Sequence, residues 1–312
     1  MDNNIKTVSF PFIGKFTPLF KEWAEKLGAK VILPPKITDN TIKIGTKYSS
    51  EMMCFPYKVT LGNFIELLKI HPEIDYLIMF DSQGRCRFRH YYILQKQMLE
   101  KLGIKKTQML ALNLKGLLSV PKIINPKLSR VKIIKYYWQL YKKIKQASIR
   151  NELLKEKPNI LIIGEIYTCL EPSINYNLED RLRKFGVNYI NSVELHTFII
   201  DILRRRIPEF IIDKKYIRQA KSYLNGPLGG HGTENIASLL EYIDKGVEGV
   251  VWLRPLTCMP ETTVDPIVKH ICQEKSVPLL TLDIDESNFA LNIETRLETF
   301  IEQVKLDYEA KK

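Results

Sequence analysis

Three cysteines of this chain stand at the ends of predicted strands and the starts of predicted helices. Cys54 is followed by Phe-Pro, and proline favours a first helical turn because its missing N–H has no partner there. Cys86 follows the apolar run at 74–80, and Cys258 follows the run at 249–253. A helix N-terminus lowers a cysteine pKa, and the thiolate is the form that binds metal. The placement therefore favours metal ligation.

Ligands of open α/β sheets bind at the carboxyl ends of the strands, so the three thiols can face one crevice although they are distant in sequence. The alternative is packing, because cysteine is common in protein cores. Packing explains one such cysteine more readily than three in the same setting. Cys272 lies within a helical pattern and is predicted to be a core residue. Cys169 also follows a strand, at 159–164, and is either a fourth ligand or a bystander.

The ligand type and spacing indicate which metal is expected. Structural zinc usually shows close Cys-x-x-Cys pairs, and the sequence contains none. Scattered thiolates joined only by the fold suit an iron–sulfur cluster. With three protein ligands, a four-iron cluster keeps one iron open as a Lewis acid. Five cysteines in a chain of 312 residues form no dense framework, which favours free thiols or metal ligands over disulfides.

Strands alternate with helices in both halves of the chain, which predicts an α/β fold with two mostly parallel, doubly wound sheets. The expected strands lie at 7–12, 30–33, 74–80, 108–112, 159–164, 187–191, 249–253 and 277–282. The main helical patterns lie at 18–27, 56–70, 87–103, 128–156, 176–185, 234–244 and 294–305. The sequences of the two halves do not visibly match.

The positive charge is concentrated between the two halves. Residues 121–157 carry 11 Lys/Arg and 2 Glu, a net of +9 out of +12 for the whole chain. The helical pattern at 128–156 within this segment is amphipathic, and its basic face is read as solvated; the alternative is docking of an acidic partner or a phosphate-bearing ligand. We expect an N-terminal α/β lobe at 1–120, this basic helical connector at 121–157, and a C-terminal α/β lobe at 158–312.

Composition and termini exclude several classes of protein. The first residues lack the order of a signal peptide, and no apolar run is long enough to span a membrane, so a cytoplasmic protein without membrane contact is expected. No nucleic-acid reader motif is visible, and no nucleic-acid partner is expected. No phosphate loop is present either, so any ATP hydrolysis must come from a partner.

Other polar residues near these positions are candidates for chemistry. Gly229 and Gly230 precede a predicted helix, and their N–H groups could face cluster sulfides or a phosphate, or form only a flexible turn. His231 is a candidate proton donor, with a capping or solvated role as the alternative. Lys58 and Glu261 follow two of the cysteines by one turn, so they could orient substrate or tune the cluster, or be surface or capping residues.

The motifs around these residues resemble a known family. The first-half blocks are Cys54-Phe55-Pro56-Tyr57-Lys58, Gly62-Asn63, and Gly84-Arg85-Cys86-Arg87-Phe88 followed by Tyr91. The second-half blocks are Gly229-Gly230-His231-Gly232-Thr233-Glu234, Cys258-Met259-Pro260-Glu261, Asp285-Glu286 and Arg296-Leu297-Glu298-Thr299-Phe300. They resemble the 2-hydroxyacyl-CoA dehydratase component and activase-related family over residues 6–303. One departure is Gly84-Arg85, where the family usually has Gly-Pro.

The resemblance implies a fold and a set of ligands. Such proteins have Rossmann-like lobes around a four-iron cluster held by three cysteines, so Cys54, Cys86 and Cys258 are the implied ligands, in the cleft between the lobes. Gly84 is the implied cofactor-binding glycine beside Cys86. The implied cofactor is a [4Fe-4S] cluster, with a double-cubane cluster as the form found in some relatives.

The resemblance also implies partners and reactions. The family's cluster receives its electron from an actin-like ATPase activator that carries its own iron–sulfur cluster. Some members dehydrate 2-hydroxyacyl-CoA substrates through a ketyl radical, usually with a paired homologous subunit. For this chain a homodimer or a paired homologous subunit is expected. We expect an electron-transfer or reductase component of such a two-component, ATP-driven system. The alternatives are a genuine 2-hydroxyacyl-CoA dehydratase subunit that binds acyl-CoA, and a non-enzymatic docking or regulatory module.

Overall fold

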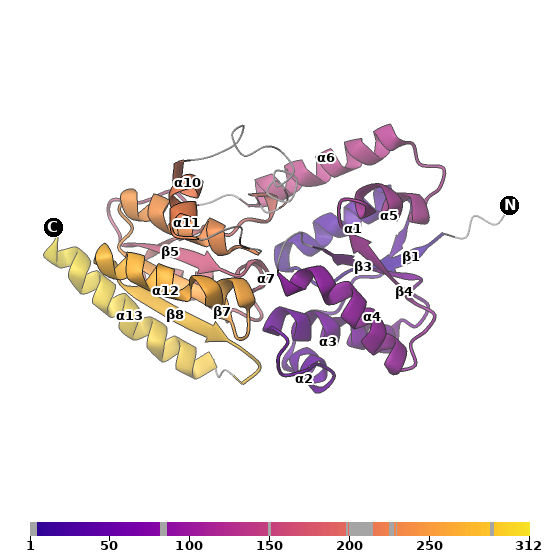
Figure 1. Cartoon of the computed structure of the whole chain (residues 1–312), viewed down its shortest axis with the longest axis horizontal. Helices are drawn as coiled ribbons and strands as arrows, with labels where there is room; N and C mark the ends of the chain where they lie inside the picture. The colour runs from indigo at the N-terminus through magenta and orange to yellow at the C-terminus, as the bar shows by residue number, and fades with distance from the viewer. Residues whose placement is uncertain are drawn as a thin grey trace. The chain divides into compact units, whose positions relative to one another are not determined.

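The computed structural model describes residues 5–81, 86–148, 151–197, 199, 215–224, 228, 230–287 and 290–312. By its internal contacts the chain divides into unit 1, Met1–Ser148, and unit 2, Ile149–Lys312. Each unit contains a four-stranded sheet flanked by helices (Figure 1). Gly84 and Gly229, two of the candidate cofactor-binding residues, lie outside the described residues.

The sheet of unit 1 is parallel throughout, with the strand order β2-β1-β3-β4. Its strands are β1 (Thr7–Ser9), β2 (Lys30–Val31), β3 (Tyr76–Phe80) and β4 (Gln108–Leu112). The central residues of β3, from Leu77 to Met79, are all buried, as the continuous apolar run predicts for a strand covered on both faces.

The sheet of unit 2 repeats this plan. It is also parallel, and its order is β6-β5-β7-β8. Its strands are β5 (Asn159–Gly164), β6 (Asn188–Asn191), β7 (Gly249–Pro255) and β8 (Leu279–Ile284). In both units the second strand in sequence lies at one edge and the fourth at the other. The predicted pair of doubly wound, Rossmann-like α/β lobes is confirmed in each unit.

The helices of unit 1 mostly follow the predicted patterns. They are α1 (Thr17–Lys26), α2 (Asp39–Lys47), α3 (Phe55–Ile70), α4 (Tyr91–Lys101), α5 (Gly116–Ile124) and α6 (Arg130–Ala147), with short 3-10 turns η1 (Gly14–Phe16) and η2 (Arg87–His90). The sequence did not predict α2 or α5. Helix α2 begins with a capping box in which Thr38 and Thr41 exchange hydrogen bonds, a signal that its weak apolar pattern obscured.

Helices α2 and α3 cross at two glycines. A Cβ atom on Gly45 would lie 1.8 Å from the backbone oxygen of Lys58, and one on Gly62 would lie 2.0 Å from that of Thr41. Only residues without a side chain allow the two backbones to approach this closely. The crossing holds the start of α3, which carries Cys54, against α2.

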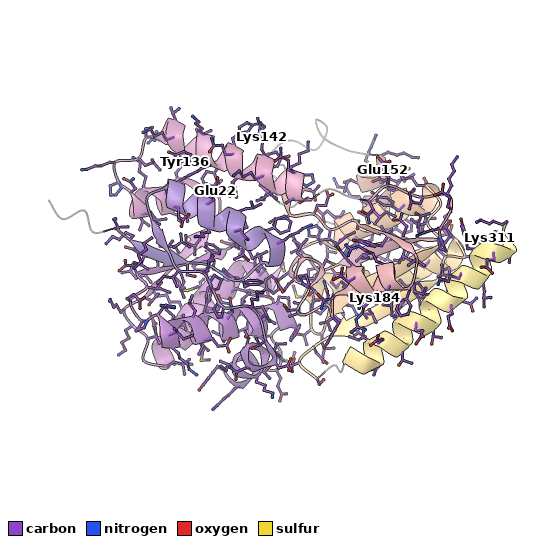
Figure 2. The ribbon with its side chains drawn as sticks, turned by 180° about the vertical axis from the view of Figure 1, so that it is seen from behind. Glu22, Tyr136, Lys142, Glu152, Lys184 and Lys311 are labelled. Atoms are coloured by element: carbon purple, nitrogen blue, oxygen red, sulfur yellow. The ribbon has the colours of Figure 1, made fainter. Side chains whose placement is uncertain are left out.

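The basic helix is part of unit 1. It spans Arg130–Ala147, so it ends nine residues before the predicted limit at 156, and it packs on α1 (Figure 2). The Trp23 and Tyr137 rings lie 5.3 Å apart between their centroids, and Lys143 Nζ lies 2.7 Å from Glu22 Oε1. The buried apolar residues of α6 thus face α1 and its neighbours, while the basic residues remain on the outside.

Unit 2 contains α7 (Ile166–Leu170), α8 (Leu178–Lys184), α10 (Lys215–Ser222), α11 (Gly232–Asp244), α12 (Met259–Glu274) and α13 (Ala290–Ala310). The sequence did not predict α7 or α10. Successive residues of β7 point to opposite faces of the sheet. Val250 and Trp252 join the apolar cluster formed with α11 and α12. A Cβ on Gly249 would meet Phe300 and Val304 of α13, which covers the other face.

No helix in the described parts of the chain combines the length and the apolar character that a membrane crossing requires. The longest one, α13, has 21 residues, but acidic and basic side chains occur throughout it. A short spanning helix needs about 20 mostly apolar residues.

Candidate functional site

Cys54 occupies the N-cap of α3. Its backbone is extended, with φ −65° and ψ 150°, and Pro56 stands in the first turn, so the chain changes from loop to helix at this residue. The Cys54 carbonyl accepts the first hydrogen bond of the helix, from the N–H of Tyr57 at 3.0 Å. The residue is buried, with 6% of its surface exposed.

Cys86 lies on a segment that is attached to the Cys54 segment. It is the N-cap of η2 and is half-buried. Arg87 Nη1 donates a hydrogen bond of 2.5 Å to the carbonyl of Met52, and the hydroxyl of Tyr91 is hydrogen-bonded to Cys54 Sγ. Two residues that follow Cys86 therefore bond residues at or just before Cys54. The structure brings these two predicted ligand segments side by side in unit 1.

Cys258 is the N-cap of α12 in unit 2 and is also buried. The preceding Thr257 has φ +62°, a conformation that turns the chain sharply away from β7. The Cys258 carbonyl accepts hydrogen bonds from the N–H of Thr262 at 2.9 Å and from its hydroxyl at 2.8 Å. The same features as at Cys54, an extended N-cap followed by proline in the first turn, position this thiol.

The shared strand order makes the positions of the two units comparable. Cys86 follows β3 and Cys258 follows β7, and each strand is the third in its unit. Each of the two cysteines caps the next helical turn. In unit 1, Cys54 caps α3, the helix that leads into β3. The corresponding helix of unit 2 is α11, which leads into β7, and its cap is His231. His231 is buried, with 6% exposed, so it is not the solvated residue considered from the sequence.

Glu261 lies in the first turn of α12 and is almost completely buried, with 1% exposed. Both carboxyl oxygens accept hydrogen bonds of 3.0 Å from the Asn235 amide, and Oε2 accepts one of 2.7 Å from the Trp252 indole. Burial raises the pKa of this carboxyl to about 8, with a contribution from Glu165, although its donors favour the charged form. Glu261 therefore links α12 to α11 and β7 in the interior, which rules out the surface position considered from the sequence.

Glu165 is a half-buried carboxyl of unit 2 that the sequence did not single out. It caps α7, and its oxygens accept hydrogen bonds from the N–H groups of Tyr167 at 3.1 Å and Thr168 at 2.9 Å. Burial raises its pKa. Asn235 bridges the backbone of Gly164, at the end of β5, to Glu261. The sequence signal that could have identified Glu165 is its position directly after the buried strand β5.

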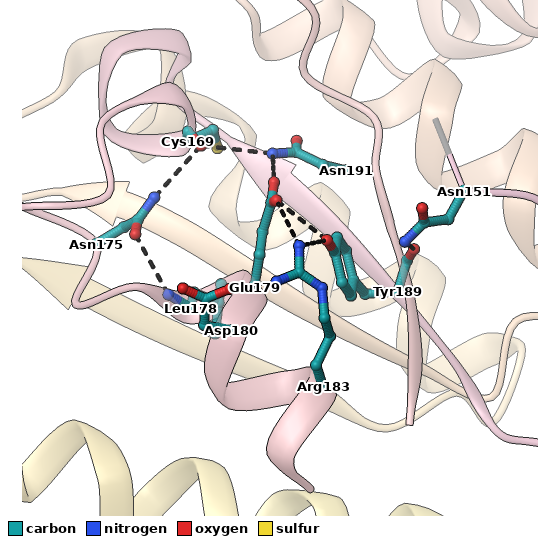
Figure 3. A network of polar contacts seen from close by, with 9 residues as sticks. All are labelled: Asn151, Cys169, Asn175, Leu178, Glu179, Asp180, Arg183, Tyr189 and Asn191. Atoms are coloured by element: carbon teal, nitrogen blue, oxygen red, sulfur yellow. Dashed lines mark hydrogen bonds and ion pairs between the residues drawn. The ribbon is translucent and has the colours of Figure 1, made fainter. Parts of the chain in front are cut away.

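Cys169 lies within α7 and does not resemble the three capping cysteines. Its carbonyl accepts hydrogen bonds from the side chains of Asn175 and Asn191, as Figure 3 shows. Burial, with the nearby carboxyls of Glu165 and Glu261, raises the pKa of its thiol well above the usual value.

The asparagine beside Cys169 belongs to a polar network on α8 and β6. Asn191 donates a hydrogen bond of 2.9 Å to Glu179, which also accepts one of 3.2 Å from the Tyr189 hydroxyl (Figure 3). Arg183 donates to the same hydroxyl at 2.6 Å. These mutually satisfied contacts join α7, α8 and β6 into one polar layer beside Cys169.

The remaining candidates have different positions. Lys58 is buried in α3, with 5% exposed, and is therefore not the surface lysine considered from the sequence. Gly230 has φ +69°, a left-handed conformation that favours glycine just before the cap of α11. Cys272 lies in the apolar core of unit 2, as predicted, and burial raises the pKa of its thiol to about 12.

Two family matches cover most of the chain. Residues 122–304 match the 2-hydroxyglutaryl-CoA dehydratase, D-component. The chain belongs to this dehydratase-component family. Residues 12–80 match a second family, described as a CoA enzyme activase uncharacterised domain. No curated protein matches the chain. The resemblance inferred from the sequence motifs is thereby confirmed.

The candidate residues divide between the two matches. The D-component match includes α6 and most of unit 2, and so contains His231, Cys258 and Glu261. The activase-domain match contains Cys54 and Lys58 and ends at the last residue of β3. Cys86 follows six residues later, between the two matched ranges. The cysteines of this dehydratase-component family member are thus drawn from separate parts of the chain.

The donor chemistry of the three capping cysteines fits an iron–sulfur cluster. Cys54 and Cys258 cap helices of 16 residues, and the start of such a helix favours a thiolate, the form of ligand that these clusters use. Cys86 caps the four-residue 3-10 turn η2. Among the residues that the structure describes, no three His, Cys, Asp or Glu side chains are gathered as a group suited to a metal ion. The structure joins the Cys54 and Cys86 segments; Cys258 belongs to the other unit.

Proposed function

We propose that this member of the dehydratase-component family is an iron–sulfur electron-transfer or reductase component of a two-component, ATP-driven system. Cys54, Cys86 and Cys258 would hold a [4Fe-4S] cluster. The observation that carries the proposal is the repeated placement of these thiols at the N-caps of helical segments, with Cys86 and Cys258 each following the third strand of its unit. Cys54 does not follow a strand as the sequence predicted, because α2 lies between it and β2. The tie between the Cys54 and Cys86 segments supports the proposal.

The chain's residues would prepare the thiols for ligation. The helix starts favour the thiolate over the thiol, and the surrounding apolar residues keep water away from sulfur at the two buried cysteines, Cys54 and Cys258. When bound, the cluster supplies one-electron chemistry at low potential and, with three thiolate ligands, an iron open to a further ligand. Burial and hydrogen bonds to sulfur are the means by which the protein sets that potential.

The candidate catalytic residues take distinct roles in this proposal. His231 would supply a proton near the open iron, because it occupies in unit 2 the position that Cys54 occupies in unit 1. Lys58 would act on the cluster through its charge, and Glu261 would do so only above about pH 8, where its carboxyl is ionised. Both are buried, so neither would touch substrate. The N–H group of Gly230, just before the cap of α11, would face a cluster sulfide.

The activase-related match supports a partner that activates the protein. We assign ATP hydrolysis to a separate actin-like ATPase with its own iron–sulfur cluster, as the family resemblance implies. The partner would deliver a single electron to the cluster of this chain. The chain itself would act as a homodimer or with a homologous subunit.

A genuine dehydratase subunit is the second candidate, and the D-component match over residues 122–304 favours it. This activity requires a site for the CoA part of a 2-hydroxyacyl-CoA. Calorimetric titration of the anaerobic protein with acyl-CoA separates the two candidates. Saturable binding supports the dehydratase subunit, and its absence supports an electron-transfer role with another acceptor.

Anaerobic purification followed by iron and sulfide analysis tests the proposed cluster. We expect about four irons for each wild-type chain, as a single four-iron cluster requires. Substitution of Cys54, Cys86 or Cys258 by Ala should each lower the iron content and alter the electron paramagnetic resonance spectrum. Cys169→Ala is the matched control and should retain the full cluster. Full iron content in all three ligand variants would refute the assignment.

A further inference from the structure

Tyr91 is a buried residue that the sequence motifs include but to which they assign no role. It is the first residue of α4 and has 2% of its surface exposed. Its hydroxyl is hydrogen-bonded to Cys54 Sγ, the sulfur of one of the three proposed ligands. A buried phenol needs a partner for its hydroxyl, and here that partner is a sulfur atom.

The position of this phenol is determined by aromatic packing. Tyr57 meets the Tyr91 ring edge-on, with centroids 5.1 Å apart and an interplanar angle of 78°. Phe88 meets it in the same way, at 5.0 Å and 84°. Both distances and angles lie in the favourable range for edge-to-face pairs. The two neighbours come from the helix that begins at Cys54 and from the turn that begins at Cys86, so the ring is fixed by both ligand segments.

The direction of the hydrogen bond follows from the chemistry of a ligating sulfur. A metal-bound cysteine has lost its proton and can only accept, so the Tyr91 hydroxyl must donate. Accepted hydrogen bonds withdraw charge from sulfur and stabilise the reduced, more negative form of a cluster. A donor at this position therefore raises the reduction potential.

We propose that Tyr91 is a positioning residue that donates a hydrogen bond to the ligating sulfur of Cys54 and thereby sets the reduction potential of the cluster. This inference rests on the proposed function, because it requires Cys54 to be a ligand. It adds a residue from outside the ligand set, and it couples the Cys54 ligand to the helix that follows Cys86.

The test compares Tyr91→Phe with Tyr57→Phe in the full chain, purified anaerobically. Both variants remove one hydroxyl from the same aromatic cluster, but only the first removes the one that bonds Cys54. Iron and sulfide content should equal the wild-type value in both. The reduction potential of the cluster is then measured by a redox titration followed by electron paramagnetic resonance. It should be more negative in Tyr91→Phe than in the wild type, and unchanged in Tyr57→Phe.

Equal potentials in the Tyr91→Phe and wild-type proteins, at full cluster content, would overturn the inference and leave the proposed function intact. Absence of iron from the wild-type protein would overturn both, and the metal analysis identifies that outcome. Resonance Raman spectra of the wild-type protein in H2O and D2O provide a measurement that needs no variant. An isotope shift of an iron–cysteine stretch supports the donated hydrogen bond, and its absence argues against it.

Discussion

The buried carboxyl of Glu261 should make the stability of unit 2 depend on pH in an unusual direction. Most buried carboxyls that accept several hydrogen bonds are stabilised in their charged form. Here burial outweighs the donors from Trp252 and Asn235, and Glu165 adds a like charge. The perturbation that tests this balance is Glu261→Gln, which keeps the size of the side chain and removes its ionisation.

The expected magnitude follows from the pKa of about 8 in the folded protein and the ordinary value of 4.5 in the unfolded chain. Between these values the folded state retains a proton that the unfolded state has lost, so the unfolding free energy falls as pH rises. At about 1.4 kcal/mol for each pH unit, the loss is about 5 kcal/mol in total. The contribution of Glu261 to the unfolding free energy is complete below about pH 4.5, decreases up to about pH 8, and is constant above that pH.

In the Glu261→Gln protein this decrease with pH should disappear. From pH 5 to pH 8 the wild-type protein should therefore lose several kcal/mol of unfolding free energy that the variant keeps. The substitution also places an amide nitrogen near the donors of Asn235 and Trp252, which adds a cost that does not vary with pH. The diagnostic quantity is therefore the slope with pH and not the stability at one pH.

Hydrogen exchange of peptides from β7 and α12, measured over a urea series at several pH values, reports the unfolding free energy of unit 2 in the full chain. Glu274→Gln is the control, because it makes the same change on the same helix at a side chain with 48% exposure. The control should parallel the wild type. If Glu261→Gln is also parallel to the wild type from pH 5 to pH 8, Glu261 is charged in the folded protein and the reasoning fails.

Three further predictions concern unit 1 and can be checked by chemical denaturation. Gly45→Ala should lower its unfolding free energy by at least about 2 kcal/mol, because the new Cβ would meet the backbone of Lys58 at 1.8 Å. Gly103→Ala, where space is open but φ is +82°, should cost only about 1 to 2 kcal/mol. Lys143→Ala should cost less than about 1 kcal/mol, because its ion pair with Glu22 is largely exposed.

Local sequence determined the elements and the places of the ligand candidates. Apolar runs such as 74–80 and 249–253 are typical of central strands of a parallel sheet, which are buried on both faces. Strands β3 and β7 form from these two runs and lie in the interior of their sheets. Proline in the first turn after Cys54 and Cys258 marked both helix starts. These signals act within a few residues of chain, which is why they can be read without a structure.

Short elements were the ones that local patterns missed. Helices α7 and α10 have 5 and 8 residues, too few for a clear helical period. Helix α2 depends on the glycine crossing at Gly45 and Gly62, where two distant segments meet. The basic pattern at 128–156 predicted α6 but not its end at Ala147. Charged residues continue beyond that end, and their pattern does not distinguish a helix from a coil.

Only tertiary structure decided which partners surround the candidate residues. The hydrogen bond between Cys54 and Tyr91, and the burial of Glu261 between Asn235 and Trp252, join residues 37, 26 and 9 positions apart in the sequence. No propensity or period encodes such a contact, because it depends on how the helices pack on the sheet. The sequence alone therefore determined which thiols are available at helix starts, and folding decided which donors and carboxyls set their chemistry.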